Sequence, residues 1–290
     1  MPRILYQVDA FTDRLFGGNP AGVVPDAAGL DDRAMQSIAR EMNCSETAFV
    51  TAPTRPGATH RVRFFTPARE VKLCGHATIA TFHVLAERRE LPGNVVMECG
   101  AGEVPIEVLR EGGRTRITMT QGKASFVDAP FRGVVSQSVG LPPDVVSPKP
   151  PPQLVSTAVW IAILPVLAVD VLSKCAPVAA KIRALGGARA VDGVYVVALG
   201  SEMGPIHEVR SRFFGAEGLG IVEDPATGVA AGALGAWLVK HARLGHGEAL
   251  VVEQGVECGR ASTLHVTVPE GGHPRVSGTA VTAFQTTIDV

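Results

Sequence analysis

The spacing of apolar residues in the first half of the chain predicts short strands around two helices. Ile4 to Asp9 alternates apolar and polar side chains, as a half-buried strand does, and a glycine-rich turn at Phe16 to Pro20 leads to a second extended run at Ala21 to Val24. The same alternation predicts further strands at Ser45 to Thr51, Thr59 to Phe65, Val95 to Cys99, Val104 to Leu109 and Thr115 to Thr120.

The two helices differ in how much of their surface is apolar. The first begins at the capping residues Asp31-Asp32, gathers its apolar side chains on one face and ends at Met42, with Asn43 as a tolerant C-cap. The second runs from His76 to Glu90 and is apolar on most sides, with its charges at the C-terminal end. A helix of this second kind is predicted to be enclosed by a sheet.

The second half of the chain repeats this outline. A second apolar helix is predicted at Val229 to Arg243, preceded by Thr227-Gly228 much as Cys74-Gly75 precedes the first. The longest apolar stretch, Leu154 to Val169, is too short to span a bilayer and is interpreted as a buried strand, a turn at Pro165 and the start of a helix. The remaining strands are predicted at Gly193 to Leu199, Glu208 to Phe214, Leu250 to Gln254, Ser262 to Val268 and Arg275 to Phe284.

These patterns predict an α+β protein of two similar domains, each a curved, mostly antiparallel sheet or barrel wrapped around a central helix. A length of 290 residues suits two cores better than one. We place the N-terminal domain at residues 1–120, with a C-terminal strand at 279–290 returning to it, and the C-terminal domain at 121–278.

Charge and cysteine content narrow the possible partners. The formal net charge is −1, so no summed positive field exists to hold nucleic acid or an anionic membrane surface. The five cysteines are odd in number and contain no CxxC pair, which argues against a disulfide framework and a zinc knuckle. The N-terminus lacks the uninterrupted apolar block of a signal peptide, so we expect a cytoplasmic protein.

Both apolar helices start at a glycine beside ionisable residues. The free N–H groups and the positive dipole end at Gly75 and Gly228 attract an anion, and if the two starts face each other the cleft between them suits a carboxylate. The alternative is that each glycine only allows tight packing. The neighbouring His76, Glu223 and Asp224 favour a site.

Two residues of the first half suit proton transfer. Glu46 starts a predicted strand directly after a helix, where apolar Phe49 and Val50 could desolvate its carboxylate; the alternative is a solvent-facing glutamate. The helix dipole would keep His76 neutral, which suits donation of a hydrogen bond or a proton to a substrate oxygen. The alternative for His76 is a capping or core histidine.

Three further residues, Asp224, Cys74 and Cys44, lie near the proposed site. Asp224 is either an N-terminal cap or a second carboxylate that orients a substrate hydroxyl or amine. Cys74 could act as a nucleophile or base activated by the helix N-terminus. Cys44 is more simply explained by packing.

Five motifs in this order resemble the PhzF-like phenazine-biosynthesis family. The resemblance runs from the first strand to Gly259-Arg260 and the terminal strands, and it implies the diaminopimelate-epimerase-like fold, a homodimer and a cofactor-free biosynthetic isomerase. The motifs are Phe16 to Ala21, Asn43 to Val50, Arg63 to Pro67, Leu73 to Thr78 and Glu223 to Gly228.

The resemblance also implies roles for individual residues. Glu46 corresponds to the family's general acid/base, with His76 and Asp224 as supporting polar residues. The family commonly has a serine where this chain has Val229, a departure that affects the substrate more than the fold. Related epimerases place a thiol on each face of the substrate. Here Cys74 occupies a position like that of the first thiol, but Asp224 to Gly228 contains no second one, so two-thiol racemisation is disfavoured.

We therefore expect an isomerase that moves a proton on a small carboxylate-bearing substrate, with no metal, organic cofactor, nucleic acid or membrane as partner. Its catalytic residues are Glu46, His76 and Asp224, and its substrate-binding residues are Gly75, Thr227, Gly228 and Val229. Two alternatives remain: a lyase or epimerase that acts on a hydroxylated amino acid through Cys74, and a non-catalytic carboxylate-binding protein, which the Val229 departure keeps open.

Overall fold

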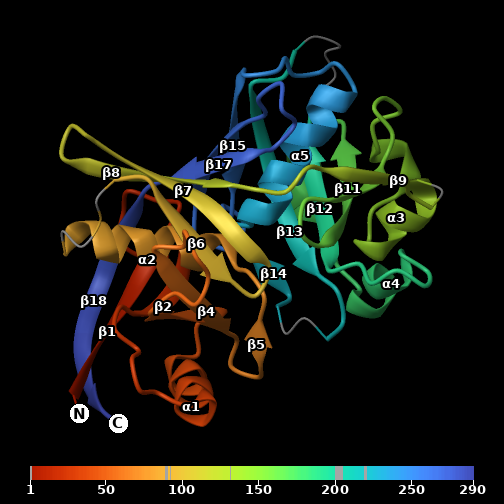
Figure 1. The fold of residues 1–290 in the computed structure, drawn as a ribbon. Coiled ribbons are helices and arrows are strands. Elements are labelled where there is room, and N and C mark those ends of the chain that lie inside the picture. Colours follow the sequence, from red (N-terminus) through yellow and green to blue (C-terminus); the bar gives the residue numbers. More distant parts are fainter. Residues whose placement is uncertain (1, 89–90, 92, 131, 200–204, 219–220) are drawn as a thin grey trace. The chain divides into compact units, whose positions relative to one another are not determined.

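The computed structural model describes residues 2–290 apart from 89–90, 92, 131, 200–204 and 219–220. The chain divides into two compact units (Figure 1): unit 1 comprises Met1–Thr120 and Ser277–Val290, and unit 2 comprises Gln121–Val276. In each unit a mostly antiparallel sheet packs around one apolar helix, which confirms the predicted α+β class.

Unit 1 is built on a sheet whose first and last strands in the sequence are neighbours. The C-terminal strand β18 pairs antiparallel with β1 from Pro2↔Asp289 to Ala10↔Ala280. Only the β2–β3 and β4–β6 pairs are parallel among the described pairings of this unit. The strands are β1 Pro2–Ala10, β2 Asn19–Val24, β3 Glu46–Thr51, β4 His60–Phe65, β5 Glu70–Val71, β6 Val95–Cys99, β7 Gly102–Glu111, β8 Arg114–Thr120 and β18 Ala280–Asp289.

The two helices of unit 1 lie close to the positions predicted from the sequence. Helix α1, Asp32–Met42, begins where the Asp31 carboxylate accepts a 2.7 Å hydrogen bond from the Ala34 N–H, and it ends at Asn43 in the left-handed conformation, with φ 51°. Helix α2, Gly75–Glu87, is buried at every position except Glu87 and contacts β1, β2, β3, β8 and β18. Its predicted end at residues 89–90 lies outside the described residues.

Unit 2 surrounds helix α5, Gly228–Lys240, with a second sheet. Its strands are β9 Ser125–Asp128, β10 Gln153–Ser156, β11 Trp160–Val166, β12 Gly193–Ala198, β13 Glu208–Gly215, β14 Glu223–Asp224, β15 Ala249–Gln254, β16 Ser262–Thr267 and β17 Arg275–Gly278, whose last residues belong to unit 1. Shorter helical segments are α3 Arg132–Ser138, η1 Pro143–Val145, η2 Val169–Lys174 and α4 Ala179–Ala184.

The predicted turn at Pro165 is wrong, because this residue lies inside β11 and pairs with Val197 of β12. A proline has no N–H to give to a neighbouring strand. Here that loss costs no bond to β10, whose pairing with β11 ends at Gln153 opposite Ile163. The helical segment that follows, η2, is a 3₁₀ helix.

The two units repeat one topology. In unit 1 a parallel pair (β2–β3) leads to an antiparallel hairpin partner (β4) and then to a parallel neighbour (β6). In unit 2 the pairs β11–β12, β12–β13 and β13–β15 have the same directions in the same order. A two-residue strand precedes the 13-residue apolar helix in both units. The two domains are therefore similar, as the sequence predicted.

Candidate active site

Glu46 is the first residue of β3 and lies beside Ala21 of the parallel strand β2. The chain reaches it directly from the left-handed turn at Asn43 that ends α1. The residue is only 8% exposed, in a strand whose next four residues are also buried. Glu46 is thus a desolvated carboxylate, not the solvent-facing one of the alternative interpretation.

Cys74 and His76 stand at the start of α2. Cys74 is the N-cap residue, in extended conformation, and its carbonyl accepts hydrogen bonds from the Thr78 hydroxyl at 2.7 Å and the Thr78 N–H at 3.1 Å. No side chain caps this helix, and its first turn contains no acidic residue. The backbone N–H groups of the first turn therefore lack the usual side-chain acceptor.

These three residues form one cluster within unit 1. The Nε2 atom of His76 lies 3.3 Å from Oε2 of Glu46, and its Nδ1 atom lies 3.4 Å from Sγ of Cys74. The ligand atoms of all three lie within 4.8 Å of one another. The imidazole thus stands between a carboxyl group and a thiol, and a cluster of these donor types is also able to hold a metal ion.

Burial lowers the pKa of His76 to about 3, because water can no longer stabilise the charged imidazolium. The imidazole is neutral at physiological pH, so its 3.3 Å contact with Glu46 is a contact between an uncharged ring and a carboxyl group rather than an ion pair. A neutral His76 was predicted from the sequence, with the helix dipole as the expected cause. In the structure the cause is desolvation by burial.

Asp224 belongs to unit 2, where a polar network holds it. One carboxylate oxygen, Oδ2, accepts a 2.6 Å hydrogen bond from the Thr227 hydroxyl. Thr227 is the N-cap of α5, yet its side chain makes no capping bond to that helix. Thr227 therefore orients Asp224, and the first turn of α5, like that of α2, has no side-chain cap and no acidic residue.

Gln254 was not among the predicted site residues, and its whole side-chain amide holds this turn in place. Its carbonyl accepts from the Thr227 N–H at 3.2 Å and from the Tyr195 hydroxyl at 2.9 Å. Its NH₂ group donates to the Asp224 carbonyl at 2.7 Å and to the Thr227 hydroxyl at 3.0 Å. An amide has two donors and two acceptor sites, so Gln254 is saturated and fully buried.

The network continues beyond Gln254 to Tyr195 and Ser211. The Ser211 hydroxyl lies 2.9 Å from that of Tyr195, and burial raises the pKa of Tyr195, which keeps the phenol a donor. One signal in the sequence could have revealed Gln254: it follows the buried Leu250 and Val252 on one face of β15, so a polar side chain occupies a core position.

The other predicted residues of unit 2 surround the start of α5. Glu223 forms a bidentate ion pair with Arg212 at 2.8 and 2.7 Å. The carbonyl of Gly228 accepts a 2.8 Å hydrogen bond from Gln121, and Val229 is half-buried.

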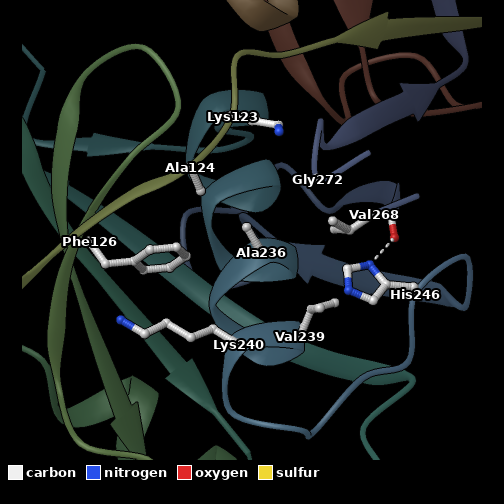
Figure 2. Close-up of a pocket in the computed structure, with 9 residues that line it drawn as sticks. All are labelled: Lys123, Ala124, Phe126, Ala236, Val239, Lys240, His246, Val268 and Gly272. Carbon is white, nitrogen blue, oxygen red and sulfur yellow. Dashed lines mark hydrogen bonds between the residues drawn. The ribbon is translucent and has the colours of Figure 1, made fainter. Parts of the chain in front are cut away.

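Unit 2 also contains a cavity of about 240 Å³ beside α5, where Lys240 lies over the ring of Phe126 (Figure 2). His246, on the other side of the cavity, is 3.3 Å from the carbonyl of Val268. None of the predicted site residues lines this cavity. Its lining residues are Lys123, Ala124, Phe126, Ala236, Val239, Lys240, His246, Val268 and Gly272.

The repeated topology shows that the two units carry different chemistry. The strand position of Glu46 in β3 is taken by Gly193 in β12, since each residue begins the second strand of a parallel pair. At the helix starts, Cys74 and His76 correspond to Thr227 and Val229. The carboxylate, imidazole and thiol are therefore a property of unit 1, whereas unit 2 offers hydroxyl and amide groups around Asp224.

Comparisons with known proteins agree with this architecture. The family model of phenazine biosynthesis-like proteins (PhzC-PhzF) matches residues 8–286. An uncharacterized isomerase of Clostridium acetobutylicum is 36% identical over 292 residues, which cover 97% of this chain and 96% of that protein. The crystal structure of a PhzF-family phenazine biosynthesis protein from Bacillus anthracis has 31% identity and a TM-score of 0.88, with both chains covered to 100%.

A more distant structure shares the fold alone. A hydroxyproline epimerase from Agrobacterium vitis has 13% identity and a TM-score of 0.67, with 99% of this chain and 92% of that chain covered. Within the described residues, every helix falls short of the length and apolar character needed to cross a bilayer.

Proposed function

Since the chain belongs to the phenazine biosynthesis-like (PhzC-PhzF) family and is an enzyme of the isomerase class, we propose that it moves a proton within a small carboxylate-bearing substrate. Glu46 is the general acid/base, and neither a metal nor an organic cofactor takes part. The observation that carries this proposal is the buried contact between Glu46 and His76 at 3.3 Å.

A general base must meet three conditions: its position must be fixed, it must lie within hydrogen-bond reach of the proton that it removes, and it must be poorly hydrated. Glu46 meets the first and last of these conditions because the start of β3 fixes its backbone and its side chain is largely withdrawn from water. We assign Glu46 the removal of a proton from a carbon that is adjacent to the substrate carboxylate or conjugated with it, and the return of that proton to another carbon.

His76 and the start of α2 complete the unit 1 part of the proposal. The imidazole of His76, whose Nε2 atom lies 3.3 Å from Oε2 of Glu46, packs against the Glu46 carboxyl group and limits where it can lie. The uncapped N–H groups at Gly75 and His76 suit the substrate carboxylate, which the helix dipole also favours. On chemical grounds we assign further substrate contacts to Asp224, Thr227, Gly228 and Val229 in unit 2.

A second candidate is a lyase or epimerase that uses Cys74, favoured by the 3.4 Å contact between its sulfur and the imidazole of His76. In that reaction the thiol, not the carboxylate, exchanges the proton. The non-catalytic alternative predicts that no C–H bond of any bound carboxylate exchanges with solvent.

We further propose a homodimer in the cytoplasm that serves a biosynthetic pathway. A reducing compartment is supported by the five cysteines, none of which forms a disulfide: Cys44, Cys74, Cys99, Cys175 and Cys258. Multi-angle light scattering of the purified protein measures the oligomeric state directly, and a mass of one chain, 30.3 kDa, would contradict the dimer.

The test is NMR detection of deuterium incorporation from D₂O into a panel of cyclic and amino carboxylates. The proposal expects site-specific exchange into at least one compound with the wild-type protein and its loss in Glu46→Gln. Glu41→Gln, which removes the same charge from an exposed position on α1, serves as the control and should exchange at the wild-type rate. Undiminished exchange in Glu46→Gln would contradict the role of this carboxylate.

A further inference from the structure

Two exposed lysines of unit 2 line the cavity beside α5 (Figure 2), and neither forms an ion pair with a described residue. Lys123 precedes β9, and Lys240 is the last residue of α5. The Lys240 ammonium lies 4.2 Å from the centre of the Phe126 ring, which holds the charge at the cavity without neutralising it. The described lining contains no acidic residue. The cavity is therefore a positively charged place in a chain whose net charge is −1.

The rest of the lining is mostly apolar. Ala236 and Val239 contribute aliphatic side chains from α5, Val268 contributes another from the end of β16, and Phe126 contributes an aromatic ring from β9. Small-molecule sites have this composition, in which apolar and aromatic side chains surround the body of the ligand and a few polar groups fix its orientation. A lining of this kind suits a flat apolar body that carries a negative charge.

Hydrogen bonds hold the rim of the cavity on the side of His246. Its Nδ1 atom lies 3.3 Å from the carbonyl oxygen of Val268 and 3.2 Å from that of Pro269, and since both oxygens are acceptors, Nδ1 carries the hydrogen. The Val268 carbonyl also accepts a 2.9 Å hydrogen bond from the Gly247 N–H. The Pro269 carbonyl accepts one of 2.8 Å from the Gly272 N–H. A ligand therefore meets a rim that is already ordered, which lowers the entropic cost of binding.

We propose that this cavity is a second small-molecule site, which binds an aromatic carboxylate of one or two rings. The ring lies against Phe126 and the aliphatic side chains, and the carboxylate is held by the ammonium groups of Lys123 and Lys240, whose long stems let them reach it. The cavity volume of about 240 Å³ lies below the roughly 300–1,000 Å³ of pockets for drug-sized ligands, which limits the occupant to this size. The proposal does not rest on the proposed function.

Saturation-transfer NMR of the full-length protein with benzoate and 2-naphthoate tests the binding. We expect saturable binding of 2-naphthoate with a dissociation constant of about 1 mM or below, since this is the affinity that a ligand of its size reaches. The uncharged benzamide and 2-naphthamide should bind more weakly. Added salt should weaken the binding of the carboxylates but not that of the amides, because ions screen exposed charges.

Substitutions in the lining locate the bound probe. Lys123→Gln and Lys240→Gln each remove one exposed charge and should weaken 2-naphthoate binding by about two- to fivefold, the worth of an exposed ion pair, and the double variant by roughly the product. Val239→Phe fills the cavity from α5 and should prevent saturation, with circular dichroism to confirm that the variant is folded. Lys181→Gln, at an exposed position of α4 outside the lining, is the matched control and should bind as the wild type does.

The proposed active site also takes a carboxylate, so the outcome in these variants decides between the two places. Affinity that is unchanged both in the double lysine variant and in Val239→Phe would put the probe elsewhere and overturn the site. Equal affinity for 2-naphthoate and 2-naphthamide would overturn recognition of the anion. Absence of saturation by both carboxylates, including the case in which only a poly-glutamate peptide binds, would overturn the small-molecule site altogether.

Discussion

Replacing His76 by glutamine should make the protein less sensitive to mild acid, although it removes a buried polar contact. Burial lowers the pKa of His76 to about 3, whereas in the unfolded chain it returns to 6.5. As the pH falls below 6.5, His76 therefore binds a proton in the unfolded state but not in the folded state. The stabilisation from a neutral His76 is complete above that pH and is lost progressively between about pH 6.5 and pH 3.

The magnitude follows from these two values. At pH 5 protonation favours the unfolded state by a factor of about 32, or about 2 kcal/mol, and at pH 7 by only about 0.2 kcal/mol. The result at pH 5 changes little for any folded-state pKa well below 5. We therefore expect the loss in unfolding free energy between pH 7 and pH 5 to be about 2 kcal/mol smaller in His76→Gln than in the wild type.

The assay is urea unfolding at pH 7 and pH 5 after metal removal with a chelator. Circular dichroism is the appropriate probe, because both tryptophans, Trp160 and Trp237, lie in unit 2. The control is His207→Gln, an exposed histidine of unit 2, which should reproduce the wild-type difference. Equal pH sensitivity in His76→Gln and the wild type would refute a buried neutral imidazole.

Substitutions at three further positions test the packing of unit 2 by the same urea method. Gln254→Leu removes the partners of Thr227 N–H and the Tyr195 hydroxyl inside the core and should cost about 3–5 kcal/mol; a cost below 1 kcal/mol, roughly one ordinary hydrogen bond, would show that the network is not structural. Trp237→Ala empties a fully buried site and should also cost about 3–5 kcal/mol, and Trp237→Phe clearly less; equal costs would contradict a tightly packed helix. Gly232→Ala places a Cβ atom 2.2 Å from the amide oxygen of Gln121 and should cost about 1–3 kcal/mol, whereas a neutral result would mean that this amide moves freely.

The sequence specified those parts of the fold that depend on neighbouring residues. Helix α1 has its cap, its apolar face and its left-handed end between Asp31 and Asn43, so each boundary was predictable from neighbouring residues. The apolar helices α2 and α5 were predictable because only an enclosed helix tolerates so little polar surface. The short helices α3 and α4 were not predicted, since six or seven residues give too few turns to show periodicity.

In the candidate site, too, residues close in the sequence were predictable and contacts between distant residues were not. Cys74 and His76 stand two residues apart at one helix start, and Glu46 follows a marked turn, so their chemistry was visible in the sequence. Gln254 was not predicted because its partners Tyr195 and Thr227 are 59 and 27 residues away. Such contacts depend on strand order, which local patterns do not determine.

The most direct test of the central claim compares the rate of solvent deuterium incorporation in Glu46→Gln and Cys74→Ser on the first carboxylate that the wild type exchanges. A general acid/base contributes about 10²–10⁴-fold, so the rate in Glu46→Gln should fall by about that factor, while Cys74→Ser should remain within about tenfold of the wild type. The reverse pattern, an active Glu46→Gln and an inactive Cys74→Ser, would contradict proton transfer by Glu46.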